Sequence, residues 1–330
     1  MNEGHLKWIG LGVSLAAVAV TAAASPERVG KSPWGADDEL GSMNMMSDAS
    51  RAAVLSRIAG GKVYDLGVEY FVGMPSWSSI GDPTYQLWMT HTPHGTAVDD
   101  PLDVGAALND KVSYTGDALS MYTHTGTHID ALNHFGLHDH IWNGFSEDKH
   151  LGDRGWNKAG AETIPPIVAR GVLIDVAAAQ GRSELPPSYD ISADDLKAAL
   201  AKQKVSLQRG DVVLIRTGRM QHFANAERYK AEPPGLNLSA ARFLVEQSGA
   251  MIVGADNLSF EAFPVETKDN WIPVHTWLLA ERGVPIMEVV DLEALARDRV
   301  YEFAFVGASL KLRGASGSPM RPVAFPLKAR

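Results

Sequence analysis

Residues 121–135 read Met-Tyr-Thr-His-Thr-Gly-Thr-His-Ile-Asp-Ala-Leu-Asn-His-Phe. This stretch places four side chains of the metal-ligand type within eleven residues: His124, His128, Asp130 and His134. The whole chain has 11 histidines in 330 residues, so three of them beside an aspartate form a dense cluster. Neutral imidazole nitrogens together with a charged carboxylate suit a borderline divalent cation. The stretch therefore predicts a metal site.

The spacing of these four residues requires a bend in the chain. All four have the same parity, so an ideal strand would direct them to one face. On that strand His124 and Asp130 would lie roughly 20 Å apart, whereas bonds from a metal ion to its ligands are about 2.0–2.2 Å long. Gly126 is the residue that can bend the chain between them.

Two local structures fit the motif. In a helix, His124 and His128 would share one face at positions i and i+4, as in zinc proteases. The alternate positions from Thr123 to Ile129 are β-branched, however, which favours extended structure over helix. We expect a strand that breaks at Gly126 and continues as a metal-binding loop.

The composition excludes several classes of protein. Cysteine is absent, which excludes disulfides, thiolate zinc sites and a cysteine nucleophile. A net charge of −9, without a basic stripe, argues against a nucleic-acid partner. With 45% apolar residues and no linker long enough to demand two domains, residues 25–330 can form one large domain.

The first 24 residues read as an export signal. Lys7 precedes an uncharged run from Trp8 to Ala24, and Ala22 and Ala24 provide the small residues of a cleavage site. The alternative is an uncleaved membrane anchor, because a run of roughly 17 residues is at the lower limit of a spanning helix. We expect cleavage of residues 1–24 and an exported, periplasmic protein without a stable membrane span.

Apolar runs and capped helices predict a mixed α/β sheet. Three short aliphatic runs predict buried strands, with helices capped by Ser192 and Ser239 between them. Another helix begins after Ser47, whereas residues 85–120 give no clear element because short apolar runs alternate there with Gly, Asp and Pro. The predicted strands are residues 63–70, 171–175, 210–218, 251–256, 284–290 and 301–312.

Two residues in the last third of the chain are further candidate ligands. His275 stands at the head of an apolar helix that Gly283 closes, and Glu288 is the single acid in the apolar strand that follows. A carboxylate buried in such a strand is costly without a cation, which makes Glu288 a candidate ligand together with His275. An exposed edge position for Glu288 is the alternative that the pattern leaves open.

The central motif resembles a known signature. His124-Thr-Gly-Thr-His128-Ile-Asp130-Ala-Leu-Asn-His134 is similar to the H-x-G-T-H-x-D-x-P-x-H motif of the metal-dependent cyclase family, which includes bacterial kynurenine formamidase and isatin hydrolase. One position departs from the motif, since Leu132 stands where the short formamidases carry proline. Other segments also look like the longer members of the family: residues 34–41, 73–75, 254–256 and 317–322.

The resemblance implies a fold, an assembly and residue roles. The fold would be the family's α/β swivelling type (β/β/α), with a mixed sheet flanked by helices. The chain would form a homodimer or homotetramer and would bind one or two ions of Mn²⁺ or Zn²⁺. The implied roles are primary metal ligand (His124, His128, Asp130), general base (His134), and second metal site or its proton network (His275, Glu288).

These parts predict hydrolysis of a small amide or lactone, such as an aryl formamide or an isatin-like cyclic amide. A divalent ion lowers the pKa of a bound water from about 15.7 towards 7 and polarises the attacked carbonyl. An imidazole outside the ligand set titrates near neutrality and can pass the proton to the leaving group. The predicted substrate-binding side chains are aromatic: Trp77, Tyr122, Phe135, Trp142 and Phe260, with Trp271 as a further candidate.

Two other classes of function remain open. His128 and Asp130 with the distant His275 also satisfy the two-histidine, one-carboxylate triad of non-haem iron oxygenases. A periplasmic metal- or ligand-binding protein without turnover would use the same cluster. Turnover without oxygen or a co-substrate would exclude the oxygenase, and hydrolysis that a chelator abolishes would exclude the binding protein.

Overall fold

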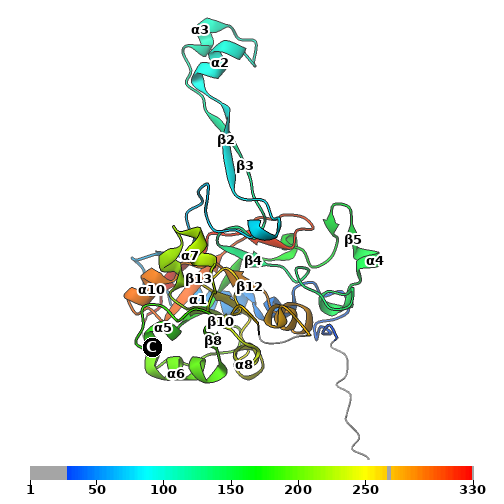
Figure 1. Ribbon diagram of the computed structural model, residues 1–330, viewed down its shortest axis with the longest axis vertical. Coiled ribbons are helices and arrows are strands. Elements are labelled where there is room, and N and C mark those ends of the chain that lie inside the picture. The colour runs from blue at the N-terminus through cyan, green and yellow to red at the C-terminus, as the bar shows by residue number, and fades with distance from the viewer. Residues whose placement is uncertain (1–27, 266–268, 329–330) are drawn as a thin grey trace, which may run out of the picture.

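The computed structural model describes residues 28–265 and 269–328, so the predicted signal, residues 1–24, lies outside the described residues. At its centre is a mixed sheet of nine strands (Figure 1). In spatial order these are β1 (Tyr64–Asp65), β15 (Val323–Pro326), β13 (Glu302–Gly307), β7 (Ile167–Asp175), β9 (Val212–Arg216), β11 (Ile252–Ala255), β12 (Ile286–Glu288), β4 (His128–Asp130) and β14 (Gly317–Pro319).

The four central strands, β7, β9, β11 and β12, run parallel to one another. Their residues are almost all buried, the pattern typical of parallel strands covered on both faces. Along β7, Val172 and Ile174 face one core and Leu173 faces the other, as the period of two requires. Antiparallel strands complete the sheet, three beyond β7 and two beyond β12.

Helices and helical turns cover both faces of the sheet. None of the helices in the described part of the chain has the length and apolar character needed to cross a membrane. The helices of the body are α1 (Asp48–Leu55), α4 (Glu147–His150), α5 (Val176–Ala179), α6 (Ala193–Gln203), α7 (Ala226–Lys230), α8 (Leu238–Arg242), α9 (Pro273–His275) and α10 (Glu293–Arg297). The short 3-10 turns are η1 (Gly41–Met45), η2 (Ser78–Ile80), η3 (Trp142–Gly144), η4 (Ala161–Thr163) and η5 (Arg219–His222). Two segments are π-helical, η6 (Phe243–Gln247) and η7 (Thr276–Glu281). Two short strand pairs lie outside the main sheet: β8 (Asp190–Ile191) with β10 (Gly235–Leu236), and β5 (Leu151–Gly152) with β6 (Gly155–Trp156).

Two of the three predicted helix caps are found. Ser47 caps α1 and Ser192 caps α6, each in a capping box with the residue three positions on. The cap of α8 was wrong by two residues: Asn237 caps this helix, and its side chain accepts from the backbone N–H groups of Ser239 and Ala240. Asparagine caps at least as well as serine, so the helix begins at the earlier residue.

The predicted strands are present with different bounds. β7 begins four residues earlier than expected because residues 167–170 continue the pairing with β13. Of residues 63–70, only Tyr64 and Asp65 pair with β15. The chain turns after Asp65, whose carboxylate accepts a hydrogen bond from the Gly67 N–H at 3.1 Å. β13 ends at Gly307 rather than continuing to residue 312.

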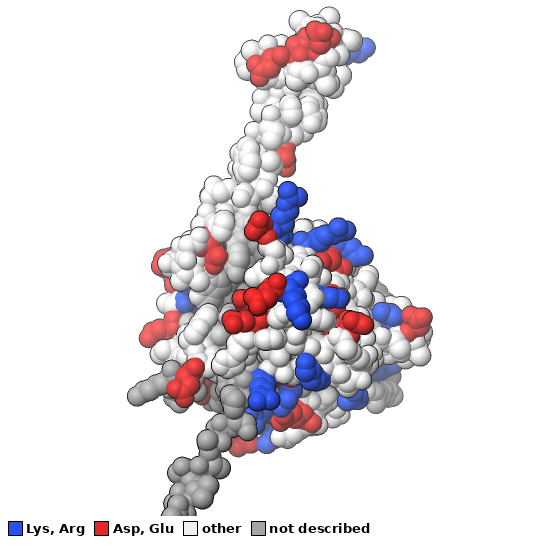
Figure 2. Space-filling view, turned by 90° about the vertical axis from the view of Figure 1, so that its right-hand side faces the viewer, with Lys and Arg blue, Asp and Glu red and all other residues white. Residues whose placement is uncertain are grey.

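Residues 86–120, which the sequence left unassigned, form an arm that stands clear of the body (Figure 1). Its two strands, β2 (Gln86–His91) and β3 (Gly116–Ser120), pair antiparallel. Two short helices, α2 (Pro93–Asp99) and α3 (Ala106–Asn109), form the tip. Both strands are largely exposed, and acidic residues gather at the tip (Figure 2).

Candidate metal centre and substrate cavity

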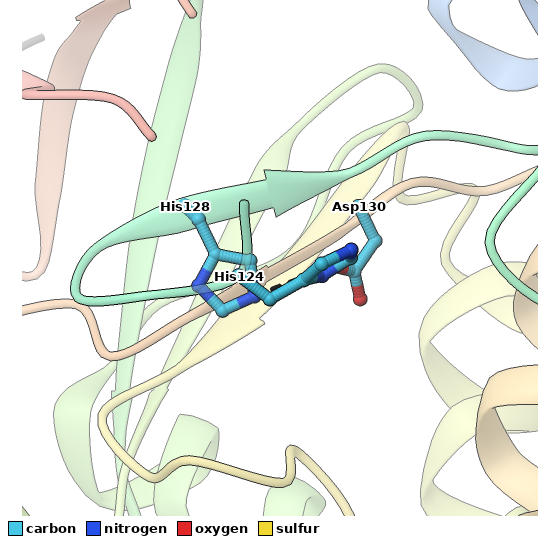
Figure 3. Close-up of side chains that lie close together, drawn as sticks. All are labelled: His124, His128 and Asp130. Atoms are coloured by element: carbon cyan, nitrogen blue, oxygen red, sulfur yellow. Dashed lines mark hydrogen bonds and ion pairs between the residues drawn. The ribbon is translucent and has the colours of Figure 1, made fainter. Parts of the chain in front are cut away.

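The bend at Gly126 is present, but its order along the chain is the reverse of the prediction. The chain first turns through residues 122–127 and then continues as strand β4, which is paired on both sides by β12 and β14. Gly126 has φ +64°, and a Cβ there would meet the Tyr70 ring at 2.6 Å, so both the backbone angle and the space require glycine. The turn brings His124 Nδ1 to 2.7 Å from Asp130 Oδ1 (Figure 3).

Sheet pairing adds the residues from the last third of the chain. The antiparallel register puts His128 of β4 opposite Glu288 of β12, with 3.4 Å between His128 Nε2 and Glu288 Oε2. His275, at the end of α9, places its Nε2 3.1 Å from Glu288 Oε1. Glu288 is 4% exposed, so the exposed edge position that its sequence pattern left open is excluded.

Two groups of side chains could each hold a metal ion, and they share Asp130. One group is His124, His128 and Asp130, and the other is Asp130, His275 and Glu288. Within each group the ligand atoms lie within 4.8 Å of one another, and all five side chains are buried. The arrangement suits one ion or a pair that shares Asp130.

Two buried atoms of this cluster, His128 Nε2 and Asp130 Oδ2, have no hydrogen-bond partner among the described residues. His128 Nδ1 lies 2.8 Å from the Gly126 carbonyl oxygen, so Nδ1 donates its proton there and Nε2 faces the cluster. A buried polar atom left without a partner costs about 1–3 kcal/mol. A divalent cation between these atoms would remove that cost, so the residues fit a metal ion.

The charge of the cluster leads to the same conclusion. Asp130, Glu288 and Glu261 are buried, and in residues 28–265 and 269–328 no Lys or Arg forms an ion pair with any of them. Burial lowers the pKa of His128, but Asp130 and Glu288 outweigh burial and raise that pKa to about 10. Burial also lowers the pKa of His275, and Glu261 and Glu288 raise it to about 10. The cluster therefore attracts positive charge, which a divalent cation would supply in exchange for protons.

Glu261 and Ser316 support the candidate ligands, and neither was predicted from the sequence. Glu261 Oε1 lies 2.8 Å from His275 Nδ1 and also accepts from the His275 backbone N–H at 3.1 Å. Ser316 Oγ lies 3.0 Å from His124 Nε2. A carboxylate behind a ligating imidazole fixes its tautomer and its orientation. One signal for Glu261 was present in the sequence, because it is a single acid between apolar neighbours, as Glu288 is.

A cavity of about 230 Å³ opens onto this cluster. Three of the predicted substrate-binding residues, Trp77, Tyr122 and Phe135, line it, as does Trp271. Asp82, which was not predicted, adds one acid from outside the metal cluster to the wall. The other lining residues are Ile80, His124, His134, Leu258, Ser259, Phe263, Ile272, His275 and Glu288.

Two of the predicted substrate-binding residues do not line this cavity. Trp142 is 2% exposed and lies against Gly283, with its indole N–H donating to Asp38 at 3.3 Å. Phe260 is fully buried in the core, with its ring centroid 6.4 Å from that of His275. The sequence could not separate a core ring from a cavity ring, because both stand among apolar neighbours.

His134 lies in the cavity wall but outside both ligand groups. Its ring stacks on that of His124 with 3.9 Å between centroids and contacts Phe135 edge-on at 4.4 Å. Burial lowers the pKa of His134 well below its usual value, the neighbouring His124 lowers it further, and Asp130 offsets only part of the shift. The prediction that this imidazole titrates near neutrality is therefore wrong, because the sequence does not show its burial beside other histidines. At neutral pH His134 is a neutral imidazole with one nitrogen that can accept a proton.

Sequence comparisons identify relatives of this chain. The cyclase family model matches residues 64–262. Cyclase-like protein 3 of Oryza sativa subsp. japonica is 30% identical over 134 residues, which are 40% of this chain and 47% of the relative. The chain thus spans about half the length of the curated relative that it matches.

Solved structures share the fold. A structure described as a novel cyclase is 29% identical, with a TM-score of 0.78 over 88% of this chain and 95% of that chain. Isatin hydrolase A from Ralstonia solanacearum is 22% identical, with a TM-score of 0.59 over 80% of this chain and 91% of that chain. At that identity the likeness to isatin hydrolase A concerns the fold alone. The predicted α/β fold, a mixed sheet flanked by helices, is confirmed.

Proposed function

The chain belongs to the cyclase family, and from that premise we propose that it is a metal-dependent hydrolase that cleaves the C–N bond of a small aryl amide or cyclic amide. The observation that carries the proposal is the pair of histidine–carboxylate groups that share Asp130 beneath an aromatic cavity. A lactone is the alternative substrate, because the same attack on its carbonyl would break a C–O bond.

The residues that would hold the cation are those of the two groups that share Asp130. Imidazole and carboxylate ligands without thiolate suit Zn²⁺ or Mn²⁺. The ion would polarise the attacked carbonyl and lower the pKa of a water molecule from about 15.7 towards 7. The chain orients the ligands, because the Gly126 carbonyl fixes the His128 ring and the Glu261 carboxylate fixes the His275 ring.

We assign His134 as the general base because of its position. It lines the cavity, belongs to neither ligand group, and is held against the His124 ring. From there one ring nitrogen would take the proton of the attacking water and return it to the nitrogen that leaves the carbonyl carbon. The new C–O bond forms at the carbonyl carbon and the C–N bond then breaks. An open-chain amide gives a carboxylic acid and an amine, and a cyclic amide opens to one molecule that carries both groups.

The cavity indicates the size and chemistry of the substrate. Its volume of about 230 Å³ is below the roughly 300–1,000 Å³ of sites for drug-sized ligands, which favours a molecule of one or two rings. Trp77, Tyr122 and Trp271 offer flat apolar surfaces to an aryl group. Asp82 can accept a hydrogen bond from an N–H group, which an aryl amide has and a lactone lacks. A likeness in fold to isatin hydrolase A supports a cyclic aryl amide as one test substrate.

The proposal is tested with purified protein reconstituted with Mn²⁺ or Zn²⁺. It should hydrolyse N-formyl anilides, isatin-like cyclic amides or aryl lactones without oxygen or any co-substrate, and a chelator should abolish turnover. A requirement for oxygen would favour the oxygenase instead. Protein that holds its metal and turns over none of the three substrate sets would be a binding protein, and the proposed function would be withdrawn.

The role of His134 is tested separately. His134→Ala should keep its metal content and lose about 10²–10⁴-fold in kcat, the usual contribution of a positioned acid–base group. His140→Ala is the matched control, because His140 is exposed and outside the cavity, and it should retain the wild-type rate. An unchanged kcat in His134→Ala would exclude this residue as the base.

A further inference from the structure

The wall of the substrate cavity contains an acid that the metal cluster does not use and no basic residue to balance it. Asp82 lines the cavity, and no Lys or Arg is among the lining residues that the structure describes. Within residues 28–265 and 269–328, the Asp82 carboxylate has no hydrogen-bond donor and no ion pair. Its negative charge is therefore available to a ligand in the cavity.

Asp82 lies where the arm joins the body, next to Tyr122 of the cavity wall. It precedes Pro83, whose carbonyl accepts a hydrogen bond from the Tyr122 N–H at 3.2 Å. Burial raises the pKa of Tyr122, and Asp82 raises it further, ahead of Asp130 and Glu288. The Asp82 charge thus acts on the Tyr122 hydroxyl more strongly than either carboxylate of the metal cluster does.

Aromatic rings form much of the wall beside this carboxylate. Tyr122, Trp77, Phe135, Phe263 and Trp271 all line the cavity. The rings of Phe135 and Trp271 are 5.7 Å apart between centroids and inclined at 65°, so they form adjoining walls rather than one flat surface. The face of an aromatic ring is electron-rich, and several such faces together bind organic ammonium groups. An unpaired carboxylate among them favours the same kind of ligand.

The two ends of the cavity differ in exposure. His275 and Glu288, at the metal cluster, are each 4% exposed, whereas Ile80 and Trp271 are 76% and 69% exposed. Asp82 is half-buried. An amide that reaches the cluster would thus leave the other end of its molecule at the exposed rim. A charged group held there keeps part of its hydration and avoids the cost of full burial.

The surroundings of the cavity favour the same sign of charge. The arm, which begins and ends beside the cavity, contains five aspartates and one lysine in residues 86–120, and the whole chain has a net charge of −9. An acidic surface beside a cavity raises the local concentration of cations and their rate of entry. A substrate with a free carboxylate would be repelled by Asp82 and by the arm, and no basic side chain of the described wall would offset this.

We propose that the substrate is a cationic aryl amide or cyclic amide, whose protonated or quaternary amine is held between Asp82 and the aromatic rings, and that it carries no free carboxylate. This inference rests on the proposed function, because it places the amide of the same molecule at the metal cluster. A partly exposed ion pair contributes up to about fivefold in affinity, and a cation–π contact at an exposed site contributes about two- to fivefold. Together they should favour a cation over a neutral analogue by about tenfold.

Three benzyl compounds test the charge preference without turnover. Benzyltrimethylammonium is a permanent cation with no lone pair for a metal ion, benzyl methyl ether is neutral, and benzenesulfonate is an anion. Isothermal titration calorimetry of the metal-loaded protein at one ionic strength measures their affinities. The cation should bind about tenfold more tightly than the ether, and the sulfonate more weakly than the ether. Equal affinities, or a preference for the sulfonate, would overturn the inference.

Two variants locate the charge that is responsible. Asp82→Asn removes one charge from the cavity wall and should weaken binding of the cation by about fivefold, with less than about a twofold change for the ether. Asp117→Asn is the matched control, because it removes the same charge from an exposed position of the arm outside the cavity, and it should change neither affinity. Equal losses in both variants would show an effect of net charge alone and would overturn the role of Asp82.

A third variant tests the aromatic rings. Trp271→Leu keeps an apolar side chain in the wall but removes the aromatic face, so it should weaken binding of the cation by at least about twofold more than binding of the ether. Equal losses for the two compounds would show that Trp271 contributes apolar contact only, and the aromatic part of the inference would be withdrawn.

Kinetics separate this inference from the proposed function. Formanilides that carry a trimethylammoniomethyl, methoxymethyl or sulfonate group in the para position should be hydrolysed with kcat/KM values that fall in that order, with about tenfold between the first two. Equal values would overturn the charge preference and leave the hydrolase in place. If none is hydrolysed while the cation binds through Asp82, the hydrolase is withdrawn and the preference of the cavity for cations stands.

Discussion

Two regions of this molecule reverse the usual distribution of side chains, and they do so in opposite directions. The cluster around Asp130 buries histidines and carboxylates in the interior. The arm exposes leucines and a tryptophan to solvent. Soluble proteins ordinarily bury apolar groups and keep charged groups exposed or paired. The cluster lacks a cation to balance its buried carboxylates, whereas the arm leaves its apolar side chains exposed.

The two regions should respond differently to substitution. The cluster needs a point charge within a few ångströms, so the loss of one ligand should remove most of the binding energy. The apolar side chains of the arm are exposed, and most substitutions of exposed residues change the free energy of unfolding by no more than about 0.5 kcal/mol. Substitutions should thus be nearly all-or-none in the cluster and small on the arm.

Asp130→Asn should have the largest effect, because Asp130 is shared by both candidate ligand groups. We expect loss of bound metal and a fall in kcat/KM of at least about 10³-fold, equivalent to about 4 kcal/mol. Elemental analysis and steady-state kinetics measure the two losses. Asp148→Asn, at an exposed position of α4, is the control. Retention of stoichiometric metal in Asp130→Asn would contradict the assigned cluster.

Glu261→Gln should have a smaller effect on the same cluster. Glu261 touches His275 and not the cavity's apolar wall, so the substitution should weaken metal affinity by about 10–100-fold through a less well oriented imidazole. Competition with a metal-binding dye measures the affinity. Full turnover at saturating metal is expected, whereas an unchanged affinity would show that Glu261 does not position His275.

Asp256 differs from the carboxylates of the cluster because it is buried and its oxygens already have hydrogen-bond donors within the chain. Its oxygens accept hydrogen bonds from the Thr217 N–H, the Thr217 hydroxyl and the Gly218 N–H. Burial raises the pKa of Asp256 to about 6, and the hydrogen bonds from Thr217 offset part of the shift. The folded state thus holds this proton more tightly than the unfolded state, whose pKa is near 3.8.

The stability contributed by Asp256 should therefore fall as pH rises from about 4 to about 6. Asp256→Asn cannot ionise, so the free energy of unfolding of wild type minus that of the variant should drop by on the order of 2 kcal/mol over this range. Urea unfolding of both proteins with chelator present measures the difference and cancels the titration of the metal cluster. Parallel pH profiles would show that the folded pKa of Asp256 is not raised.

Trp88→Ala should give the smallest effect, because Trp88 is 50% exposed on the arm and does not line the cavity. We expect unchanged metal content and a change of no more than about 0.5 kcal/mol in the free energy of unfolding. Elemental analysis and urea unfolding measure the two quantities. A loss of metal as complete as that of Asp130→Asn would contradict the contrast between the two regions.

The sequence predicted the centre of the molecule better than its periphery. Buried parallel strands are visible as continuous aliphatic runs, so β7, β9 and β11 could be located. Ser192 marked the start of α6 correctly. The first ligand group could be predicted because all of its members lie within seven residues of one another. The bend at Gly126 followed from simple distances along a strand.

What could not be predicted depends on contacts between distant segments. Whether Glu288 faces the cluster is decided by the register of β12 against β4. The support of His275 by Glu261 is decided by a loop and helix α9, which meet only in the folded chain. The same limit applies to Trp142, whose burial depends on Gly283. The arm could not be predicted because its strands carry apolar side chains on both faces. Apolar and polar residues therefore do not alternate along them, and this alternation is the pattern that identifies a half-buried strand.

The way in which the arm joins the body affects how the chain tolerates changes in length. The chain leaves the body before β2 and returns to it after β3, and a hydrogen bond from the Tyr122 N–H to the Pro83 carbonyl joins these two points. Neither β2 nor β3 belongs to the nine-stranded sheet. Insertions or deletions in pairs along this hairpin would leave every register of that sheet unchanged, whereas a one-residue slip in β4 would turn its side chains to the opposite face. The same scaffold can therefore carry interchangeable hairpins of different reach around a constant ion-binding core.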